Sequence, residues 1–132
     1  MTFTDDTSQI KPENLGGFFA GWKNPPSKEK LLELLKNSFC VVLAVDDKTG
    51  NVVGSINALS DKLLFACIPL LEVLPDWQGR GIGSTLLNLM LEKLKAYYAV
   101  DLCCEKELVP FYERFDFSSV AGLIKRNSEN IK

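Results

Sequence analysis

The sequence predicts an α+β fold with a mixed, mostly antiparallel sheet. Three strand-like apolar runs follow one another between residues 39 and 74 and are joined by short polar turns, a pattern typical of antiparallel strands. Beyond residue 82 the pattern alternates helix, strand, helix and strand, which favours a mixed sheet over a doubly wound one. With 132 residues, 46% of them hydrophobic, the chain suffices for one core, so residues 1–132 are expected to form one domain.

The first helix and the first hairpin are predicted from capping and turn residues. Ser27 can cap a helix from Lys28 to about Lys36, which carries leucines at helical spacing. A β-branched run over residues 39–45 and a second run over 52–59 flank the polar turn 46–51, so these two runs are expected to pair as a hairpin.

The second half of the chain predicts a long strand, two helices and two further strands. The strand covers residues 63–74 and is interrupted at Pro69, which has no N–H to donate to a neighbouring strand. A helix over about residues 82–96 follows, then a strand at 100–104, a helix near 107–114 and a last strand at about 117–124.

A glycine-rich run separates the long strand from the helix that begins near residue 82. Glycines alternate in it with other residues: Gln78-Gly79-Arg80-Gly81-Ile82-Gly83. Glycines let the backbone approach a bound group closely, and a helix start offers unpaired N–H groups to an anion. The run lacks the lysine of a P-loop and the spacing of a dinucleotide fingerprint, so it predicts a diphosphate site of another kind.

This run matches the pattern Q/R-x-x-G-x-G/A and resembles the phosphate loop of the GNAT superfamily of acetyl-CoA-dependent N-acyltransferases. Two further segments resemble the same family. Residues 73–77 are similar to its V-x-P-x-Y/W approach to the loop, and residues 110–117 to its F-Y-E-K-x-G-F segment, with Asp116 where glycine is usual. The resemblance covers roughly residues 39 to 120 and implies a sheet with splayed central strands and an N-acetyltransferase.

The resemblance also implies roles for individual residues. The loop amides would hold the pyrophosphate of acetyl-CoA, the backbone of a splayed strand would bind the pantetheine arm, and Tyr112 would act as the general acid. The residues matched to acetyl-CoA binding are Leu71, Glu72, Val73, Gln78, Gly79, Arg80, Gly81, Ile82, Gly83 and Ser84.

A general base for the amine is not evident from the sequence. The chain has no histidine, and Cys67 stands where many relatives of this superfamily carry glutamate. The base must therefore be a carboxylate, a water chain or bulk solvent. Glu72 and Glu105 are the candidate carboxylates, and each can also be a solvated charge or a structural partner. Glu72 reaches the same face of the strand as Cys67 only if a bulge near Pro69 reverses the alternation of side chains.

Composition agrees with a small cytoplasmic enzyme domain. The N-terminus has no basic, apolar leader, and no run is long enough to cross a membrane. The net charge of −2 gives no basic patch for nucleic acid, and four cysteines without histidine predict reduced thiols and no metal site.

The acceptor is expected to be a primary amine, and the sequence leaves its identity open. Aromatic residues near the N-terminus, Phe18, Phe19 and Trp22, faintly resemble the front region of arylalkylamine-type acetyltransferases or simply cover the core. Two further questions also stay open. The chain is an enzyme, a non-catalytic acyl-CoA-binding regulatory module, or a structural α+β domain whose glycines serve only the turn. A homodimer is compatible with so small a domain.

Overall fold

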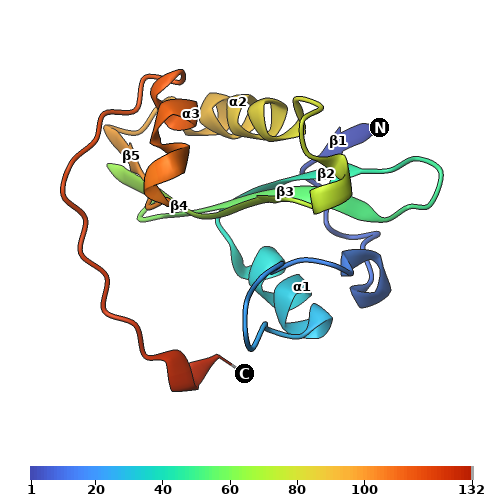
Figure 1. Cartoon of the computed structure of the whole chain (residues 1–132). Coiled ribbons are helices and arrows are strands. Elements are labelled where there is room, and N and C mark those ends of the chain that lie inside the picture. The colour runs from blue at the N-terminus through green and yellow to red at the C-terminus, as the bar shows by residue number, and fades with distance from the viewer. Residues whose placement is uncertain (132) are drawn as a thin grey trace.

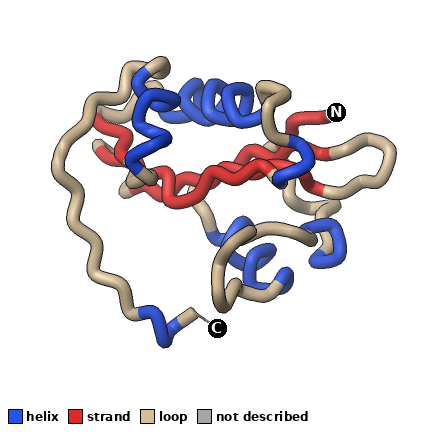
Figure 2. Tube along the Cα trace, in the orientation of Figure 1, coloured by secondary structure: helices blue, strands red, loops and turns tan. Residues whose placement is uncertain are grey.

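The computed structural model describes residues 1–131 and contains one five-stranded sheet in the order β1-β2-β3-β4-β5 (Figures 1 and 2). The first four strands pair antiparallel, and β5 pairs parallel to β4. The predicted α+β class with a mostly antiparallel sheet is confirmed. The strands are β1 (Thr2–Thr4), β2 (Cys40–Val45), β3 (Val52–Ser60), β4 (Phe65–Val73) and β5 (Ala99–Asp101).

Helices cover both faces of the sheet (Figure 1). One face packs against α2 (Ile82–Leu94) and α3 (Val109–Glu113), through a core that includes Leu86, Met90 and Tyr112. The other face packs against α1 (Lys28–Asn37) and the short helix η1 (Pro12–Leu15). The sheet therefore separates two apolar layers.

The predicted first helix is confirmed, and its start has the expected cap. The Ser27 Oγ accepts a hydrogen bond of 3.0 Å from the Lys30 N–H. Leu31 and Leu35 lie on its buried side, one turn apart, and pack on the sheet.

A bulge interrupts β4 at the proline. Asn57 pairs with Leu70 and Leu59 pairs with Cys67, so Ile68 and Pro69 together face the single residue Ala58. The extra residue reverses the alternation of side chains along the strand. Cys67 and Glu72 consequently project from the same face of β4, which confirms the bulge that the sequence analysis considered.

The splay between β4 and β5 is also confirmed. Only Phe65 to Cys67 pair with β5, and the rest of β4 continues with no strand on that side. Because Leu74 N–H donates to Val53 O at 2.9 Å and Leu70 N–H to Asn57 Oδ1 at 3.1 Å, the amides of Leu71 and Val73 point to the opposite side, into the gap.

The last predicted strand is wrong. Residues 117–127 form no helix or strand in the structure, and the chain runs outward past the sheet edge and ends below α1 (Figure 1). Asp116 has φ 67°, the left-handed conformation that glycine usually adopts. Phe117 still packs against the core beside Tyr112, and the described residues after it are exposed. The apolar sequence has strand propensity, but within residues 1–131 it finds no strand to pair with.

Two other differences concern short elements. The sequence analysis missed β1, whose three residues are too few to show alternation and form a strand only by pairing with β2. The predicted strand at 100–104 is shorter, because β5 ends at Asp101. None of the helices described for residues 1–131 has the length and apolar character needed to cross a membrane.

Candidate functional site

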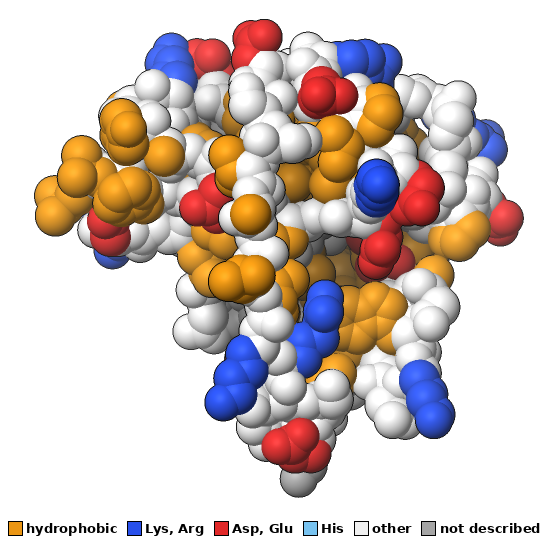
Figure 3. Space-filling model, turned by 60° about the vertical axis from the view of Figure 1, so that its left-hand side comes forward, with side chains coloured by type: hydrophobic (Ala, Val, Ile, Leu, Met, Phe, Trp, Pro, Cys, Tyr) orange, Lys and Arg blue, Asp and Glu red, His pale blue; other side chains and the backbone are white. Residues whose placement is uncertain are grey.

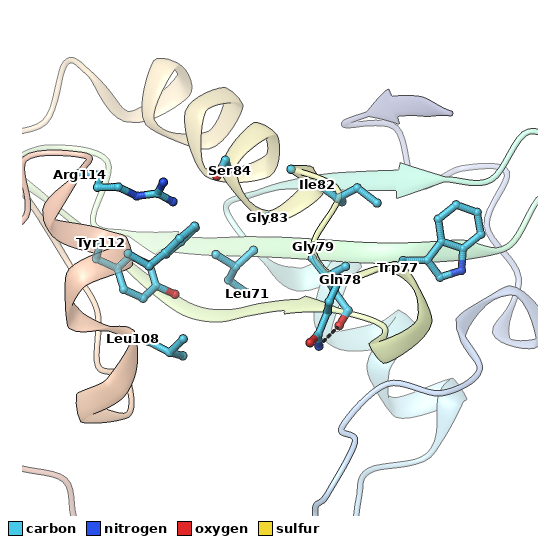
Figure 4. Close-up of a pocket in the computed structure, with 13 residues that line it drawn as sticks. Leu71, Trp77, Gln78, Gly79, Ile82, Gly83, Ser84, Leu108, Tyr112 and Arg114 are labelled. Atoms are coloured by element: carbon cyan, nitrogen blue, oxygen red, sulfur yellow. Dashed lines mark hydrogen bonds between the residues drawn. The ribbon is translucent and has the colours of Figure 1, made fainter.

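A pocket of about 570 Å³ lies where β4 separates from β5, between the start of α2 and α3 (Figure 4). Eight of the ten residues predicted to bind acetyl-CoA line it: Leu71, Val73, Gln78, Gly79, Gly81, Ile82, Gly83 and Ser84. The other walls come from residues that the cofactor prediction did not include: Trp77, Leu108, Phe111, Tyr112 and Arg114.

The glycine loop forms the polar end of this pocket. Gly79 and Gly81 have φ angles of 77° and 81°, which side chains disfavour, and no atom lies within 4 Å of a Cβ built at either position. The loop thus turns twice without placing a side chain over the pocket.

The start of α2 supplies unpaired hydrogen-bond donors. The first intrahelical bond runs from Thr85 N–H to Gly81 O at 3.1 Å. Among the described residues, the N–H groups of Ile82, Gly83 and Ser84 have no partner, and the first turn has no acidic side chain. Open amides and the positive end of the helix dipole together fit an anionic group such as a diphosphate.

Gln78 and Arg80 stabilise the loop in different ways. The Gln78 side chain donates from Nε2 to Val73 O at 3.0 Å, which ties the loop to the end of β4 (Figure 4). Arg80 does not line the pocket. Its guanidinium donates to Asp76 O at 3.1 Å and lies 4.8 Å from the centre of the Trp77 ring. The loop therefore presents backbone amides to the pocket and keeps this charge outside it.

Tyr112 forms the opposite wall from α3. The residue is only 8% exposed, and its hydroxyl points toward the space between Leu71 and Leu108 (Figure 4). No hydrogen bond to this hydroxyl is found within residues 1–131. Burial, with a smaller contribution from Cys104, raises the pKa of Tyr112 above its ordinary value of 10.0, so the phenol is protonated at neutral pH.

A family model decides what kind of protein this site belongs to. The model of the acetyltransferase (GNAT) family matches residues 7–117, which include the glycine loop and Tyr112. The chain belongs to the GNAT family. This confirms the resemblance drawn from the glycine loop and the Tyr112 segment.

Relatives agree with membership of the GNAT family. A protein named uncharacterized N-acetyltransferase ycf52 of Pyropia yezoensis is 31% identical over 101 residues, which is 74% of this chain and 58% of that protein. Uncharacterized N-acetyltransferase YitH of Bacillus subtilis is 24% identical over 97% of this chain and 45% of its own length. The chain thus spans about half the length of the curated relatives it matches.

Solved structures share the whole fold of this GNAT domain. A protein of Deinococcus radiodurans R1 assigned to the acetyltransferases is 42% identical, with a TM-score of 0.94 over 98% of this chain and 90% of that one. GNAT family protein SP0256 of Streptococcus pneumoniae is 32% identical, with a TM-score of 0.76 over 96% of this chain and 98% of that one.

Glu72 faces away from the pocket and toward the N-terminal segment. Its two carboxylate oxygens accept hydrogen bonds from the backbone N–H groups of Phe19, at 2.8 Å, and Ala20, at 3.1 Å. Its own amide lies on the β3 side of β4, where Ser55 pairs with it. Of the predicted backbone partners for pantetheine, only Leu71 and Val73 point into the gap of this GNAT sheet.

Two acidic residues complete the survey of candidate bases. Glu105, predicted as a candidate, is exposed at the start of the short helix η3 (Lys106–Leu108). Asp101, which the sequence analysis did not single out, pairs with Cys67 across β4 and β5 and lies beside its thiol. Burial and the Asp101 carboxylate raise the pKa of the Cys67 thiol to about 11, so this thiol is neutral at pH 7.

Arg114 is the other functional candidate that sequence reasoning missed. It lines the pocket, and its side chain points toward the first turn of α2 near Ser84 (Figure 4). Its guanidinium lies 5.2 Å from the centre of the Phe111 ring, and no ion pair with it is found in residues 1–131. In the sequence, the position of Arg114 two residues after Tyr112 was the signal that could have identified it as a pocket residue. In the same part of the chain, no cluster of three potential metal-binding side chains occurs.

Proposed function

We propose that this GNAT domain transfers the acetyl group of acetyl-CoA to a primary amine by direct attack in a ternary complex. The observation that carries the proposal is one continuous pocket with open backbone amides at one end and a protonated Tyr112 hydroxyl at the other. Acetyl-CoA carries a diphosphate and a thioester joined by a long arm. The open amides suit the diphosphate, and the hydroxyl suits the thioester. The four free cysteines suit a reducing cytosol as the setting.

The cosubstrate would be held mainly by backbone groups. The amides at the start of α2 are available to the pyrophosphate, and Arg114 adds a positive charge on the facing wall. The free edge of β4 offers Leu71 and Val73 to the amide groups of the pantetheine arm, as a neighbouring strand would use them.

The chemistry needs stabilisation of an oxyanion and protonation of a thiolate. The amine nitrogen bonds to the thioester carbon, and the carbonyl oxygen takes the negative charge, which a backbone N–H of Leu71 or Val73 stabilises. Collapse of the intermediate breaks the carbon–sulfur bond, and Tyr112 gives its proton to the sulfur. The proton that the attached nitrogen loses as it becomes the amide returns Tyr112 to its protonated form. A thiol has a pKa of about 8.5, below that of the Tyr112 phenol. The phenol therefore donates its proton to the sulfur only while the carbon–sulfur bond is breaking and negative charge develops on the sulfur.

The attacking amine must first lose a proton. For an amine with a pKa of about 10.4, deprotonation at pH 7 costs about 4.6 kcal/mol. Glu72 already accepts two backbone hydrogen bonds, whereas Asp101 is exposed and its side chain is close to the Cys67 thiol. We therefore assign the proton acceptor to Asp101 and a holding role to Glu72.

A second cavity lies between the N-terminal segment and the start of α1, and its apolar walls make it our candidate for the body of the amine. It measures about 320 Å³, and Phe18, Phe19, Pro25 and Pro26 contribute to its walls. A screen of acceptors would begin with arylalkylamines and continue with polyamines, amino sugars and peptide N-termini.

The alternative function is a regulatory module that binds acyl-CoA without turnover. The observation in its favour is that Cys67 is a neutral thiol where many relatives carry a glutamate base, while Glu72 is bound to backbone amides. Both functions require coenzyme binding, and only the enzyme requires Tyr112.

The first experiment is calorimetric titration with acetyl-CoA, with ADP and NAD as controls, followed by detection of free thiol during the amine screen. Selective binding of acetyl-CoA and amine-dependent thiol release are expected. Binding without thiol release for any amine class would favour the regulatory module, and absence of binding would remove both functions.

A further inference from the structure

Asn57 is a polar side chain buried within an apolar layer. It lies in β3 and is only 3% exposed. The residues that pair with it, Val41 on β2 and Leu70 on β4, belong to the apolar layer shared with α1. The space-filling view shows hydrophobic side chains gathered in the hollow on that side of the sheet as well (Figure 3). A polar group in such surroundings costs free energy unless its hydrogen bonds are made, so the partners of Asn57 indicate its role.

Both ends of the Asn57 side-chain amide are hydrogen-bonded. Its Nδ2 donates to the Ser38 Oγ at 3.0 Å, and the Ser38 Oγ donates in turn to Leu34 O at 2.9 Å. Its Oδ1 accepts from the Leu70 N–H at 3.1 Å. Because the Ser38 hydroxyl gives its one proton to a carbonyl, it can only accept from Asn57. This direction fixes the side-chain amide with its oxygen toward β4.

Leu70 is the residue at which the interrupted pairing between β3 and β4 resumes. Ile68 and Pro69 together face Ala58, and Pro69 has no N–H to donate. The Leu70 N–H is therefore the first backbone donor after the proline. The Asn57 side chain binds this N–H beside the bulge, so it secures β4 at the point where the strand is bent.

The hydrogen bond to Leu70 also orients the next amide along the strand. Successive residues of an extended strand direct their backbone groups to opposite sides. With the Leu70 N–H held toward β3, the N–H of Leu71 points into the gap between β4 and β5. Leu71 lines the pocket there. Asn57 is buried on the other side of this residue, so it acts on the pocket only through the backbone of β4.

We propose that Asn57 is a positioning residue for acetyl transfer, because its side chain aims the Leu71 N–H at the thioester carbonyl oxygen. The inference rests on the proposed function, in which a backbone N–H of Leu71 or Val73 stabilises the oxyanion. This hydrogen bond strengthens as the oxygen becomes negative, so a misdirected N–H lowers kcat more than the affinity for acetyl-CoA. A purely structural Asn57 would affect the stability of the fold and leave the direction of this N–H unchanged.

The variant that tests this role is Asn57→Leu, which has a similar volume and removes both polar ends of the side chain. Ser55→Ala is the matched control. Ser55 is also buried in β3 and lies on the same face two residues earlier, but no hydrogen bond from its side chain to β4 is found within residues 1–131. Thermal unfolding of both variants checks that each is folded.

Two measurements by nuclear magnetic resonance use the chain without ligand. In Asn57→Leu the Leu70 amide should exchange with solvent about 10-fold faster, the effect of losing one hydrogen bond. The Leu74 amide, which donates to Val53 O, should keep its rate. The N–H dipolar coupling of Leu71 in an aligned sample should change, since it reports the direction of this bond. All three quantities should stay the same in Ser55→Ala.

Two further measurements use bound acetyl-CoA. In the unaltered chain the Leu71 N–H should lower the infrared stretching frequency of the thioester carbonyl below that of free acetyl-CoA, and Asn57→Leu should reverse most of this shift. The kcat of Asn57→Leu should fall about 10–100-fold, the range for a displaced oxyanion donor, while the Kd for acetyl-CoA rises by less than about 10-fold. Ser55→Ala should keep the frequency, the kcat and the Kd of the unaltered chain.

An unchanged Leu71 N–H direction and carbonyl frequency in folded Asn57→Leu would overturn the proposal, and so would equal losses in Ser55→Ala. If the unaltered chain transfers the acetyl group and Asn57→Leu does so at the same rate, only the role of Asn57 fails. If the unaltered chain binds no acetyl-CoA or releases no thiol, the proposed function fails and the role of Asn57 in it fails too. Should Asn57→Leu not fold, Asn57→Ser, whose shorter side chain does not reach Leu70, is measured in the same way and the same outcomes decide.

Discussion

The Glu72 carboxylate accepts a hydrogen bond of 2.8 Å from the backbone N–H of Phe19. Phe19 has φ 61°, a left-handed conformation that costs a non-glycine residue about 1 kcal/mol or more. The second carboxylate oxygen accepts from Ala20 N–H at 3.1 Å, so a single side chain on β4 holds both amides of the turn. Glu72 thus fixes the N-terminal segment against the sheet.

Glu72→Gln should loosen this turn, because an amide side chain can accept only one of the two hydrogen bonds. The free energy of unfolding should fall by about 1.5–3 kcal/mol, the usual contribution of a hydrogen bond to a charged group. In steady-state kinetics the KM for the amine should rise, with little change in kcat or in its pH profile.

Glu105→Gln, at an exposed position, is the matched control and should change neither stability nor KM. A large fall in kcat of Glu72→Gln, with loss of the acidic limb of the pH profile, would instead assign Glu72 as the general base.

Tyr112→Phe tests the proposed general acid. Removing the hydroxyl should lower kcat by about 10²–10⁴-fold, the range for a general acid, and leave the affinity for acetyl-CoA nearly unchanged. Tyr98→Phe, at an 81% exposed position, should have no effect on either quantity. A normal kcat for the Tyr112 variant would remove this residue from the mechanism.

Most of the fold and the polar end of the pocket could be predicted from the sequence, because their signals are local. Ser27 before a leucine-rich helix, a polar turn between β-branched runs and alternating glycines before a helix each act over a few residues. The bulge at Pro69 follows from the missing N–H of one residue.

The missed features depend on contacts between distant parts of the chain. Glu72 meets Phe19 across 53 positions, and Asp101 meets Cys67 only through the pairing of β4 with β5. The expected strand at 117–124 fails for a related reason, since strand propensity does not show whether a partner edge is within reach. Arg80 was included among the acetyl-CoA-binding residues by its place in the loop, but it stacks on Trp77 and does not line the pocket.

Gly81→Ala and Gly50→Ala form a matched pair for the glycine loop. Both glycines have positive φ, 81° and 76°, and nothing lies within 4 Å of a Cβ built at either position. Each change should therefore cost about 1–2 kcal/mol of stability through backbone strain. Only Gly81→Ala should also weaken acetyl-CoA binding in calorimetry, because Gly50 lies in the β2–β3 turn. Equal affinities of the two variants would contradict the placement of the diphosphate.

Arg114→Gln and Arg80→Gln test which arginine meets the phosphates. Arg114 lines the pocket, whereas Arg80 is stacked on Trp77 outside it. The loss of one charged hydrogen bond should weaken acetyl-CoA binding about 10–100-fold in Arg114→Gln and reduce the salt dependence of binding. Arg80→Gln should bind nearly as well as the unaltered chain, and the reverse order would restore the assignment of Arg80 to the phosphates.

Cys67 provides a pH-dependent test of the arrangement at the β4–β5 junction. Burial and the nearby Asp101 carboxylate raise its pKa to about 11, and thiol alkylation requires the thiolate. In a variant that keeps Cys67 as its one cysteine, the alkylation rate should rise until about pH 11. Asp101→Asn should lower this midpoint, because the carboxylate disfavours the thiolate.

The raised pKa of Cys67 also makes a contribution to the free energy of unfolding. This contribution is present below the unfolded pKa of about 8.5 and is lost as the pH rises through 11. Cys67→Ala should flatten the fall in unfolding free energy over that window, and an unchanged alkylation midpoint in Asp101→Asn would contradict the proximity of the two side chains.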